Sequence, residues 1–521
     1  MMEKITPLVT LLPILTLLVV VMFRNRNNIN TLIRVGSIML VSSMFISLVM
    51  FTLLYSNSEL HSLILDTAIL GELLRFDTLS TTMYLMVSII GWVVLRFSKT
   101  YLQGELNQAS FIRKLLTTIA FVQLLVLSGN LYTLLFSWFA TSISLQGLIG
   151  YYSNRKEARQ AVKKKFPVAR MSDFALLIAV VLLHVEFSSV ELTTIFQGLK
   201  NIEPNQVSFT LELAGIFLVL AAIIKSVQLP FHGWILDVME SPTPVSGLLH
   251  AGLLNAGPFL IIRCAHLLEI TSIAPVLLLL IGGISALYGT IVFPTQPAIK
   301  TSLAYSSIGH MGFSLMMCGM GFYSAALLHL VAHSFYKAHA FLSSGSTIDR
   351  YRLNQISIRP THINIWQLLA GILTVGGLYY FVMVFYGSQQ HNSFQLMILG
   401  TIIIAGVSCF MARTTTVKNG FSTIIKGIVM SGFVLVAFFT LESTIGIFIA
   451  DQIPSLTSPN TLIKGISLSL MILFIGTIFY SVFSGLNERE ALSKWQVYQR
   501  NGFYIHVIFD RFLSSIYPNK K

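Results

Sequence analysis

The chain has 521 residues, of which 54% are apolar and 11% are charged, and its mean hydropathy is +0.75. Soluble domains carry about 25% charged residues, so this composition excludes a single soluble domain and predicts a polytopic membrane protein. The net charge of +13 would suggest a nucleic-acid partner in a soluble protein, but here it indicates cationic loops that face anionic lipid headgroups.

About fifteen stretches are long and apolar enough to cross a hydrocarbon layer of about 30 Å, so we expect an all-α membrane fold. No cleavage signal follows the first stretch, whose apolar run is long enough to remain in the bilayer. The expected cores are 5–23, 35–55, 78–96, 115–129, 131–151, 172–187, 208–230, 242–262, 273–293, 301–320, 323–345, 363–386, 395–412, 423–450 and 463–484.

Lysine and arginine concentrate after alternate spans, which indicates the orientation of the chain. Cations follow spans one, three and five, with a dense cluster at 155–170, whereas the exit from span two holds Glu59, Asp66, Glu72 and Asp77. Cationic loops stay on the cytoplasmic side. We therefore expect the N-terminus outside and the C-terminus in the cytoplasm of a cell inner or plasma membrane, and we interpret the cluster at 155–165 as a topological anchor.

Lys225 lies inside the seventh apolar stretch, Phe209–Pro230. A lysine at the bilayer centre costs about 2.5–3.5 kcal/mol, so it must be paired, neutral or in contact with water. Pro230 lacks a backbone donor and clashes with the preceding turn, which predicts a broken helix whose freed carbonyls need a wet or protein-lined cavity. The two features together predict a proton or ion path.

A second group of titratable residues lies in span eleven. His329, His333 and Lys337 are spaced at i, i+4 and i+8, so they share one face of an apolar helix. Histidine titrates near neutral pH and passes protons between its ring nitrogens, so we interpret the stripe as a relay. Two alternatives are a metal site, for which the segment offers no carboxylate or thiolate, and histidines that only pack by hydrogen bonding.

Further polar residues extend these two groups. Asp173 at the start of span six is a candidate counter-ion of Lys225. His250, Tyr305 and His310 are expected to line the same path because membrane-interior polar groups face the bundle. Near the cytoplasmic ends, four residues have an access role or a loop role: His232, Asp237, Glu240 and Lys300.

Motifs for chemistry are absent from the sequence. Cys264, Cys318 and Cys409 have no CxxC spacing, so no zinc, iron–sulfur or disulfide framework is expected. The chain has no P-loop and no dinucleotide fingerprint. We therefore expect a transporter or channel subunit and not an enzyme, with no catalytic residue, no metal ligand and no cofactor in this chain.

After Gly485 the chain becomes polar and then amphipathic. Tyr504, Ile508 and Phe512 share one helical face, and the charges around them prevent a membrane span. We expect residues 486–521 to form a cytoplasmic tail, either as an interfacial anchor or as a docking element for a partner.

Three long segments, Lys225–Gly252, Ala298–Gly321 and Leu328–Ile348, together with Arg170-Met-Ser-Asp173, carry a family resemblance. They closely resemble the antiporter-like proton-channel subunits of respiratory complex I and of Mrp-type cation/proton antiporters. The resemblance spans roughly residues 75–350. It implies that Lys225 is the channel lysine with His250 as its neighbour, and that the span-eleven stripe is a relay.

The same resemblance implies two inverted five-helix repeats, each with a broken helix. The domains expected from it are N-terminal helices at 1–112, a first repeat at 113–265, a second repeat at 266–420, C-terminal helices at 421–484 and the tail at 485–521.

The chain departs from this family in three places. Phe139 stands where the family carries a glutamate that partners the channel lysine, so Lys225 needs another partner. Span twelve, where complex I relatives carry a second lysine, has no charge. The chain also stops soon after Phe503-Tyr-Ile, without the final span and lateral helix of the distal complex I subunit.

These departures make the chain most similar to the membrane subunit of DabB/MpsA-type inorganic-carbon accumulation complexes. The resemblance implies an ion-conducting subunit, with the proton favoured over Na+, that couples proton motive force to a cytoplasmic, zinc-containing, carbonic-anhydrase-like partner of the DabA/MpsB type. Whether CO2 or bicarbonate is handled is left open. The alternatives are an Mrp-type antiporter subunit, a complex I proton-pumping subunit and a non-conducting membrane scaffold for the partner.

Overall fold

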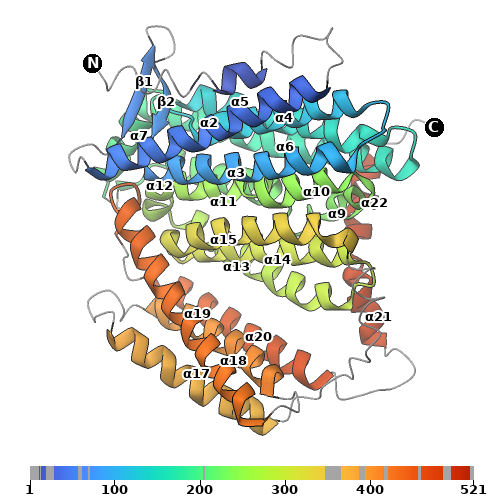
Figure 1. The fold of residues 1–521 in the computed structure, drawn as a ribbon. Coiled ribbons are helices and arrows are strands. Elements are labelled where there is room, and N and C mark those ends of the chain that lie inside the picture. The colour runs from blue at the N-terminus through green and yellow to red at the C-terminus, as the bar shows by residue number, and fades with distance from the viewer. Residues whose placement is uncertain are drawn as a thin grey trace.

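The computed structural model describes residues 11, 13–18, 29–56, 62–67, 71–203, 206–346, 365–385, 394–415, 420–455, 459–484 and 494–516. These residues form long helices that run roughly parallel and stack in layers (Figure 1). The first expected span, 5–23, lies mostly outside the described residues.

The first layer consists of the helices that precede the lysine-bearing segment. Two of them begin at polar caps: Asp77 accepts the backbone N–H of Ser80, and Asn130 accepts that of Thr133, in reciprocal capping boxes. These boxes explain why both helices begin sharply, the first directly after a strand and the second after a short turn. The layer contains α2 (Ile29–Ser56), α3 (Thr78–Tyr101), α4 (Gln108–Val126), α5 (Leu131–Ile149), the short turn η1 (Gly150–Tyr152), α6 (Lys156–Phe187) and α7 (Leu192–Lys200).

The helix α6 corrects one sequence interpretation. The cationic cluster at 155–170 was read as a loop after span five, but the structure makes it the first turns of α6, whose 32 residues span about 48 Å. This length exceeds the roughly 30 Å of a hydrocarbon core, so the helix can carry exposed cations at one end and Asp173 further in.

A small antiparallel hairpin of β1 (Leu63–Thr67) and β2 (Gly71–Phe76) was not expected. Its second strand alternates in burial, with Leu74 and Phe76 inward, and the backbone of Arg75 donates to the Leu127 carbonyl. The acidic loop expected after span two is thus partly a structured cap on one end of the bundle.

The central layer contains the broken helix and the most deeply buried span. Helix α8 (Phe209–Lys225) ends at Lys225 itself, and Pro230 lies in the irregular segment that follows. The break is confirmed, although the helix ends five positions before the proline. The chain then continues through α9 (Gly233–Asp237), η3 (Val238–Glu240), α10 (Thr243–Leu248), the π-helical turn η4 (Leu249–Leu253), α11 (Ala256–Arg263) and α12 (Ala265–Ile270).

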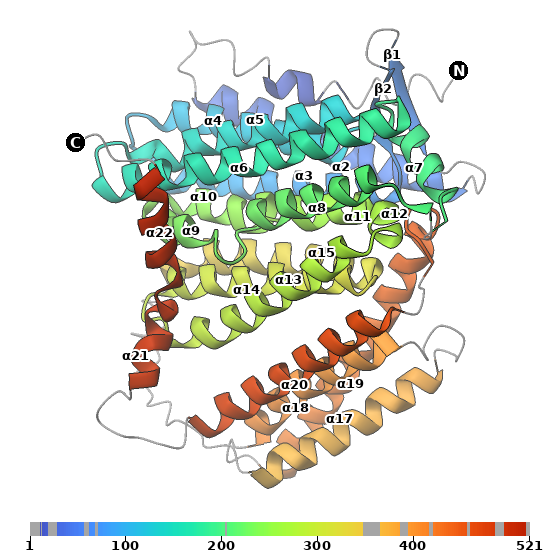
Figure 2. The same cartoon turned by 180° about the vertical axis from the view of Figure 1, so that it is seen from behind.

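Three further helices pack against this layer, as the view from behind shows (Figure 2). Gly289 and Gly309 allow the backbones of the first two to touch, because a Cβ built on Gly289 would lie 2.5 Å from the Gly309 Cα. Small residues are the usual means of close helix contact in membranes. The three helices are α13 (Ile273–Val292), α14 (Ile299–Gly319) and α15 (Tyr323–Leu342), with short turns η5 (Phe293–Thr295) and η6 (Ser344–Ser346).

The C-terminal helices form a separate layer with much less buried surface. Only 17–22% of the apolar window is buried in three of these helices, against 100% for the central span Thr243–Arg263. Exposed apolar side chains such as Phe433 and Ile472 indicate faces for lipid or other membrane chains. The layer contains α17 (Ile365–Phe385), α18 (Phe394–Thr415), α19 (Gly420–Ile449) and α20 (Thr461–Ser484).

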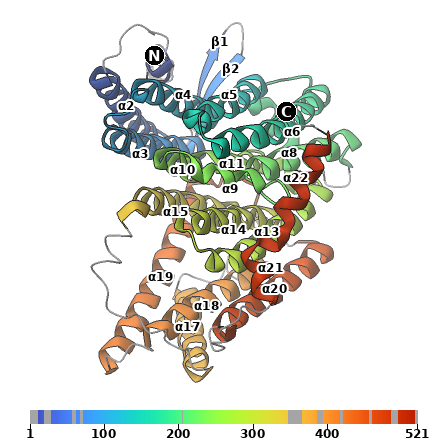
Figure 3. The same cartoon turned by 90° about the vertical axis from the view of Figure 1, so that its right-hand side faces the viewer.

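The tail folds back onto the bundle. Helices α21 (Lys494–Arg500) and α22 (Ile505–Ile516), joined by η7 (Gly502–Tyr504), cross the ends of the long helices (Figure 3). Ten helices of the described residues are long and apolar enough to cross a membrane, so the expected count of about fifteen is not confirmed. Helix α8 has only 17 residues, and α14 and α15 carry polar path residues, which explains part of the difference.

Candidate functional site

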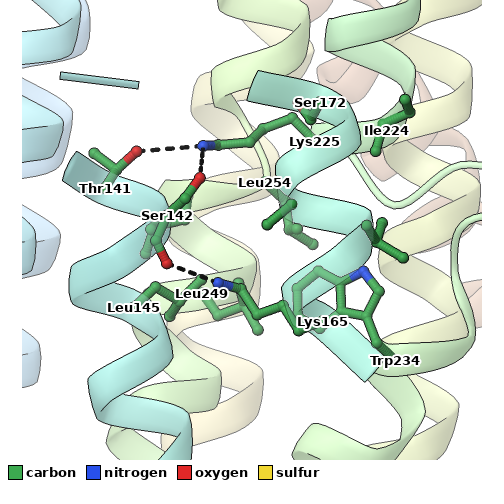
Figure 4. A pocket seen from close by; sticks show the side chains of 13 residues that line it. Thr141, Ser142, Leu145, Lys165, Ser172, Ile224, Lys225, Trp234, Leu249 and Leu254 are labelled. Atoms are coloured by element: carbon green, nitrogen blue, oxygen red, sulfur yellow. Dashed lines mark hydrogen bonds between the residues drawn. The ribbon is translucent and has the colours of Figure 1, made fainter. Parts of the chain in front are cut away.

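Lys225 is placed by the C-terminal end of α8, where the chain leaves the helix. Its Nζ donates to the Trp138 carbonyl at 3.0 Å. It also donates to Thr141 Oγ1 at 3.3 Å and to Ser142 Oγ at 2.6 Å (Figure 4). The Trp138 ring lies 4.5 Å from the same nitrogen. Three acceptors match the three N–H bonds of a protonated amine, so α5 provides a complete shell for an ammonium ion.

A cavity of about 30 Å³ lies beside this lysine and holds a second cation. Lys165 of α6 reaches into it and donates to the Ser142 carbonyl at 2.8 Å, next to the Trp234 ring. A space of about 10–15 Å³ accommodates one water molecule, so the cavity has room for water between the two amines. Leu249, Leu253 and Leu254 of the span that carries His250 close the opposite wall.

Asp173 is connected to Lys225 through one hydroxyl group. The Ser142 hydroxyl lies 3.3 Å from Asp173 Oδ1 and 3.2 Å from the Trp138 carbonyl, so its single hydrogen can point to either oxygen. Asp173 Oδ2 forms an ion pair with Arg170 at 2.7 Å. The expected direct pairing of Asp173 with Lys225 is not formed, because no carboxylate in the described part of the chain lies within ion-pair distance of that lysine.

Phe139, the residue in the place of the family glutamate, supports this arrangement from outside. Its ring lies 4.3 Å from the guanidinium carbon of Arg170, a cation–π contact. The Phe139 ring therefore contacts Arg170, and Arg170 in turn forms the ion pair with Asp173. The carboxyl group connected to Lys225 is that of Asp173 on α6, through the Ser142 hydroxyl. Position 139 carries no carboxyl group.

Two members of this site were missed from the sequence. Lys165 was grouped with the topological anchor because it lies in a cationic run, yet only 3% of it is exposed. Its spacing of eight residues from Asp173 is the same helical spacing that marked His329 and Lys337, and this pattern could have identified it. Ser142 offered no signal, because one hydroxyl among many in an apolar span is not distinctive.

His250 lies in the π-helical turn η4 and is fully buried. Its ring stacks on Phe341 at 4.4 Å between centroids. Neither ring nitrogen has a hydrogen-bond partner within the described residues. Single π turns occur often at functional sites, and this one places an imidazole between the Lys225 cavity and α15.

The expected stripe on α15 is confirmed, and α14 adds His310 to it. The His310 ring lies 5.2 Å from the His329 ring and 4.9 Å from the His333 ring. Lys337 is fully buried and donates to the Leu303 carbonyl at 2.9 Å. In the portion of the chain that is described, no cluster of three His, Cys, Asp or Glu side chains has the geometry to hold a metal ion.

The residues with expected access roles lie at the end of the bundle that the tail covers. His232 Nε2 is 3.0 Å from the Tyr288 hydroxyl, and that hydroxyl donates to the Gly502 carbonyl of the tail at 3.0 Å. The Tyr305 ring packs 5.9 Å from Tyr288. Tyr305 is therefore near the tail and is not in contact with the histidine cluster.

Ion pairs also connect side chains at this end of the bundle, which the tail covers. Lys164 Nζ lies 2.7 Å from Asp237 and 2.7 Å from Asp510 of α22. Glu240 pairs loosely with Arg155 at 4.0 Å, and both are exposed. Lys300 is half-buried at the start of α14.

Two family profiles match the chain. The profile described as NADH:quinone oxidoreductase/Mrp antiporter, TM, matches residues 128–362. The profile described as NADH-ubiquinone oxidoreductase (complex I), chain 5 N-terminus, matches residues 73–112. Together they cover more than half of the chain and include Lys165, Lys225 and Lys337 and the histidines of α14 and α15.

Curated relatives match over the same region. The "Probable inorganic carbon transporter subunit DabB2" of Halothiobacillus neapolitanus is 40% identical over 307 residues, 58% of this chain and 55% of that protein. The "Probable inorganic carbon transporter subunit DabB" of Hydrogenovibrio crunogenus is 36% identical over 59% of this chain and 60% of its own. NADH-quinone oxidoreductase subunit L of Rickettsia typhi is 32% identical over 58% of this chain and 47% of its own. The chain thus spans about half of the length of the relatives it matches.

Two solved structures share the fold. The Mrp complex from Dietzia sp. aligns with 98% of this chain and 57% of its own, with a TM-score of 0.58 and 18% identity. An archaeal membrane-bound sulfane sulfur reductase aligns with 96% of this chain and 98% of its own, with a TM-score of 0.60 and 15% identity. At these identities the likeness concerns the fold alone.

Proposed function

Because this chain belongs to the antiporter-like membrane subunits of the NADH:quinone oxidoreductase and Mrp families, we propose that it conducts protons for an inorganic-carbon uptake complex. Titratable groups buried between its membrane helices support this proposal. The observation that carries the proposal is the Lys225–Ser142–Asp173 connection, which joins a buried amine to a carboxyl through one hydroxyl.

The transfer step at this site uses only groups of the chain. The Lys225 ammonium gives one proton to Ser142 Oγ while the Ser142 hydroxyl hydrogen passes to Asp173 Oδ1, which leaves a neutral amine and a neutral carboxylic acid. Rotation of the Ser142 hydroxyl toward the Trp138 carbonyl interrupts the connection.

The second part of the path runs from His250 to the cluster on α14 and α15. Its imidazoles accept a proton on one nitrogen and release it from the other, with water between rings that do not touch. Each proton that crosses about 100 mV releases about 2.3 kcal/mol, which is enough to bias a reversible hydration or uptake reaction about fiftyfold per charge.

The carbon chemistry belongs to another chain in this proposal. The named relatives are inorganic carbon transporter subunits, and this chain has no motif for hydrating CO2. We expect a cytoplasmic, zinc-containing partner with carbonic-anhydrase-like chemistry. The cationic end of α6 and the tail lie together through the Lys164–Asp510 pair, which supports a cytoplasmic C-terminus because cations favour that side.

Purification from the native membrane tests this assignment. The account predicts one large zinc-bearing soluble partner, and uptake of labelled bicarbonate that a protonophore abolishes and a sodium ionophore does not. Several small membrane subunits would support an Mrp-type antiporter instead. Flavin or iron–sulfur absorbance in the purified complex would support a complex I subunit and contradict the proposal.

The tail is the proposed contact with that partner. Ile508 and Phe512 are exposed on α22, and the Phe512 ring lies beside Phe509, which packs on Phe231. The double variant Ile508→Lys and Phe512→Lys keeps the contact of Phe509 with Phe231 and should release the partner while the subunit stays in the membrane. Undiminished co-purification of the partner would mean that the exposed face only contacts lipid.

A further inference from the structure

A second, larger cavity is lined by residues of β2, α3, α7, α11 and α12. The hairpin that contains β2 lies at the end of the bundle opposite α21 and α22 (Figures 1 and 2). The volume of the cavity is about 430 Å³. Buried Asp77 and Arg263 form its floor, and exposed Lys200 and Asp451 lie at its rim. It shares no lining residue with the lysine and histidine path.

The floor of this cavity holds more positive than negative charge. One carboxylate oxygen of Asp77 accepts from Arg75 Nε at 3.0 Å and also from Arg263 Nη1. The other oxygen accepts the backbone N–H and the hydroxyl of Ser80 at 2.9 and 2.8 Å. Burial alone would raise the pKa of Asp77, but Arg263 and then Arg75 hold it well below its ordinary value of 3.8. Among the residues that line the floor, one carboxylate therefore contacts two guanidiniums, and the Glu72 carboxylate outside the lining reaches Arg75 only through the Thr193 hydroxyl.

The rim of the cavity carries one cationic and one acidic side chain, Lys200 and Asp451. The Nζ atom of Lys200 donates to the main-chain carbonyl of Asp451 at 3.1 Å. Three cationic side chains and two carboxylates line the cavity, so its wall carries one net positive charge when His266 is neutral. Burial, and then the nearby Lys200, lower the pKa of His266 to about 4, so the imidazole is neutral at physiological pH.

Two buried nitrogen atoms of the wall lack a partner among the described residues. These are Arg263 Nη2, in a residue that is 3% exposed, and His266 Nε2, in one that is 7% exposed. Buried donors without acceptors are rare in proteins, particularly on charged groups. Both residues line the cavity, so an acceptor placed inside it would satisfy them.

We propose that this cavity binds one small monovalent oxyanion of the bicarbonate or nitrate class. Arg263 Nη2 and the His266 ring donate to its oxygens, and Lys200 attracts it at the rim. A single net charge favours a monoanion over a dianion, and donors that diverge from two side chains suit an anion with several oxygens better than a halide. The site uses none of the groups assigned to proton conduction, so the two proposals stand separately.

Calorimetric titration of the full-length protein in detergent tests this site, with potassium nitrate and potassium bicarbonate as probes. We expect saturable binding of one anion per chain, with potassium sulfate and potassium chloride at least about tenfold weaker. Lys200→Gln should weaken nitrate binding about tenfold. Arg263→Lys keeps a cation for Asp77 but removes Nη2, and it should abolish binding. The control Lys156→Gln removes an exposed cation from the opposite end and should leave binding unchanged.

Two outcomes with the unmodified protein overturn the proposal, and a third comes from the variants. One is the absence of saturable nitrate or bicarbonate binding to the unmodified protein, and the other is equal affinity for chloride. If Arg263→Lys does not fold, His266→Phe takes its place, because it removes only the ring nitrogens. Unchanged nitrate affinity in both Lys200→Gln and His266→Phe would show that the cavity is not the site.

Discussion

Two lysines of the proposed path, Lys225 and Lys337, sit in very different surroundings. Lys225 has three oxygen acceptors, a tryptophan ring and a carboxyl group one hydroxyl away. Lys337 has one main-chain carbonyl as a hydrogen-bond partner and imidazoles nearby. Lys225 can thus exchange a proton with an acid, whereas Lys337 can exchange only with neutral bases or water. The first site is suited to control proton transfer, and the second to pass protons on.

The strongest test of this comparison is Lys225→Ala. The variant removes the group that starts transfer, and general acid–base groups contribute about 10²–10⁴-fold, so uptake driven by proton motive force should fall at least ~100-fold. Immunoblots of membranes should show an unchanged amount of protein. Lys156→Ala, at the exposed start of α6, is the matched control and should retain full uptake.

Lys337→Gln should have a smaller effect. The amide can still donate to the Leu303 carbonyl, and neighbouring imidazoles and water offer a bypass, so we expect a loss of about tenfold in the same uptake assay. A loss as large as that of Lys225→Ala would mean that the two lysines act as equal stations.

A substitution in the histidine cluster distinguishes a proton relay from a metal site. His333→Leu keeps the volume of the side chain and removes titration, so uptake should fall about tenfold, again at the low end of acid–base effects. Elemental analysis of the purified subunit should give the same metal content before and after the change. Stoichiometric metal that the variant loses would show that His333 is a ligand.

Ser142→Ala should lower uptake less than His333→Leu does, because Lys225 keeps two of its three hydrogen-bond acceptors. The direct link to Asp173 is lost and water must replace it, so uptake should fall about threefold to tenfold. Ser142→Thr retains the hydroxyl and should recover most of the activity. Equal loss in both variants would indicate a packing defect in place of a broken relay.

The smallest effect is expected at the position where the family carries glutamate. In Phe139→Glu the new carboxylate would compete with Asp173 for Arg170, but position 139 is 42% exposed and exposed ion pairs are weak, so uptake should fall about twofold. A severalfold gain in uptake would show that a carboxylate at 139 reaches Lys225, and that the route through α6 is secondary.

Local patterns in the sequence predicted the parts of the site that lie on one helix. The stripe of His329, His333 and Lys337 follows from helical spacing alone, and the break after Lys225 follows from depth and a nearby proline. The contacts of Ser142 and Lys165 depend on how α5, α6 and α8 pack together. No spacing within one segment contains that information.

The fold shows the same division between local and tertiary information. The length of the apolar stretches predicts most of the helices. It does not predict the hairpin, because the two short strands lie in a segment that the sequence presents as an acidic loop. The alternating burial of Glu72, Leu74 and Phe76 is the pattern that indicates a strand. The tail was correctly expected to be amphipathic, but its contact with Tyr288 through Gly502 joins residues more than 200 positions apart.

The central claim is that Lys225 must release its proton, and Lys225→Arg tests it most directly. Arginine can donate to the same oxygens of α5 but does not deprotonate in proteins. The complex would be reconstituted with its partner in liposomes, and internal acidification would be followed with a trapped pH dye under an imposed membrane potential and external bicarbonate. The account predicts acidification for the unmodified complex and none for Lys225→Arg. Equal acidification in both would show that a fixed positive charge is sufficient and that Lys225 does not transfer protons.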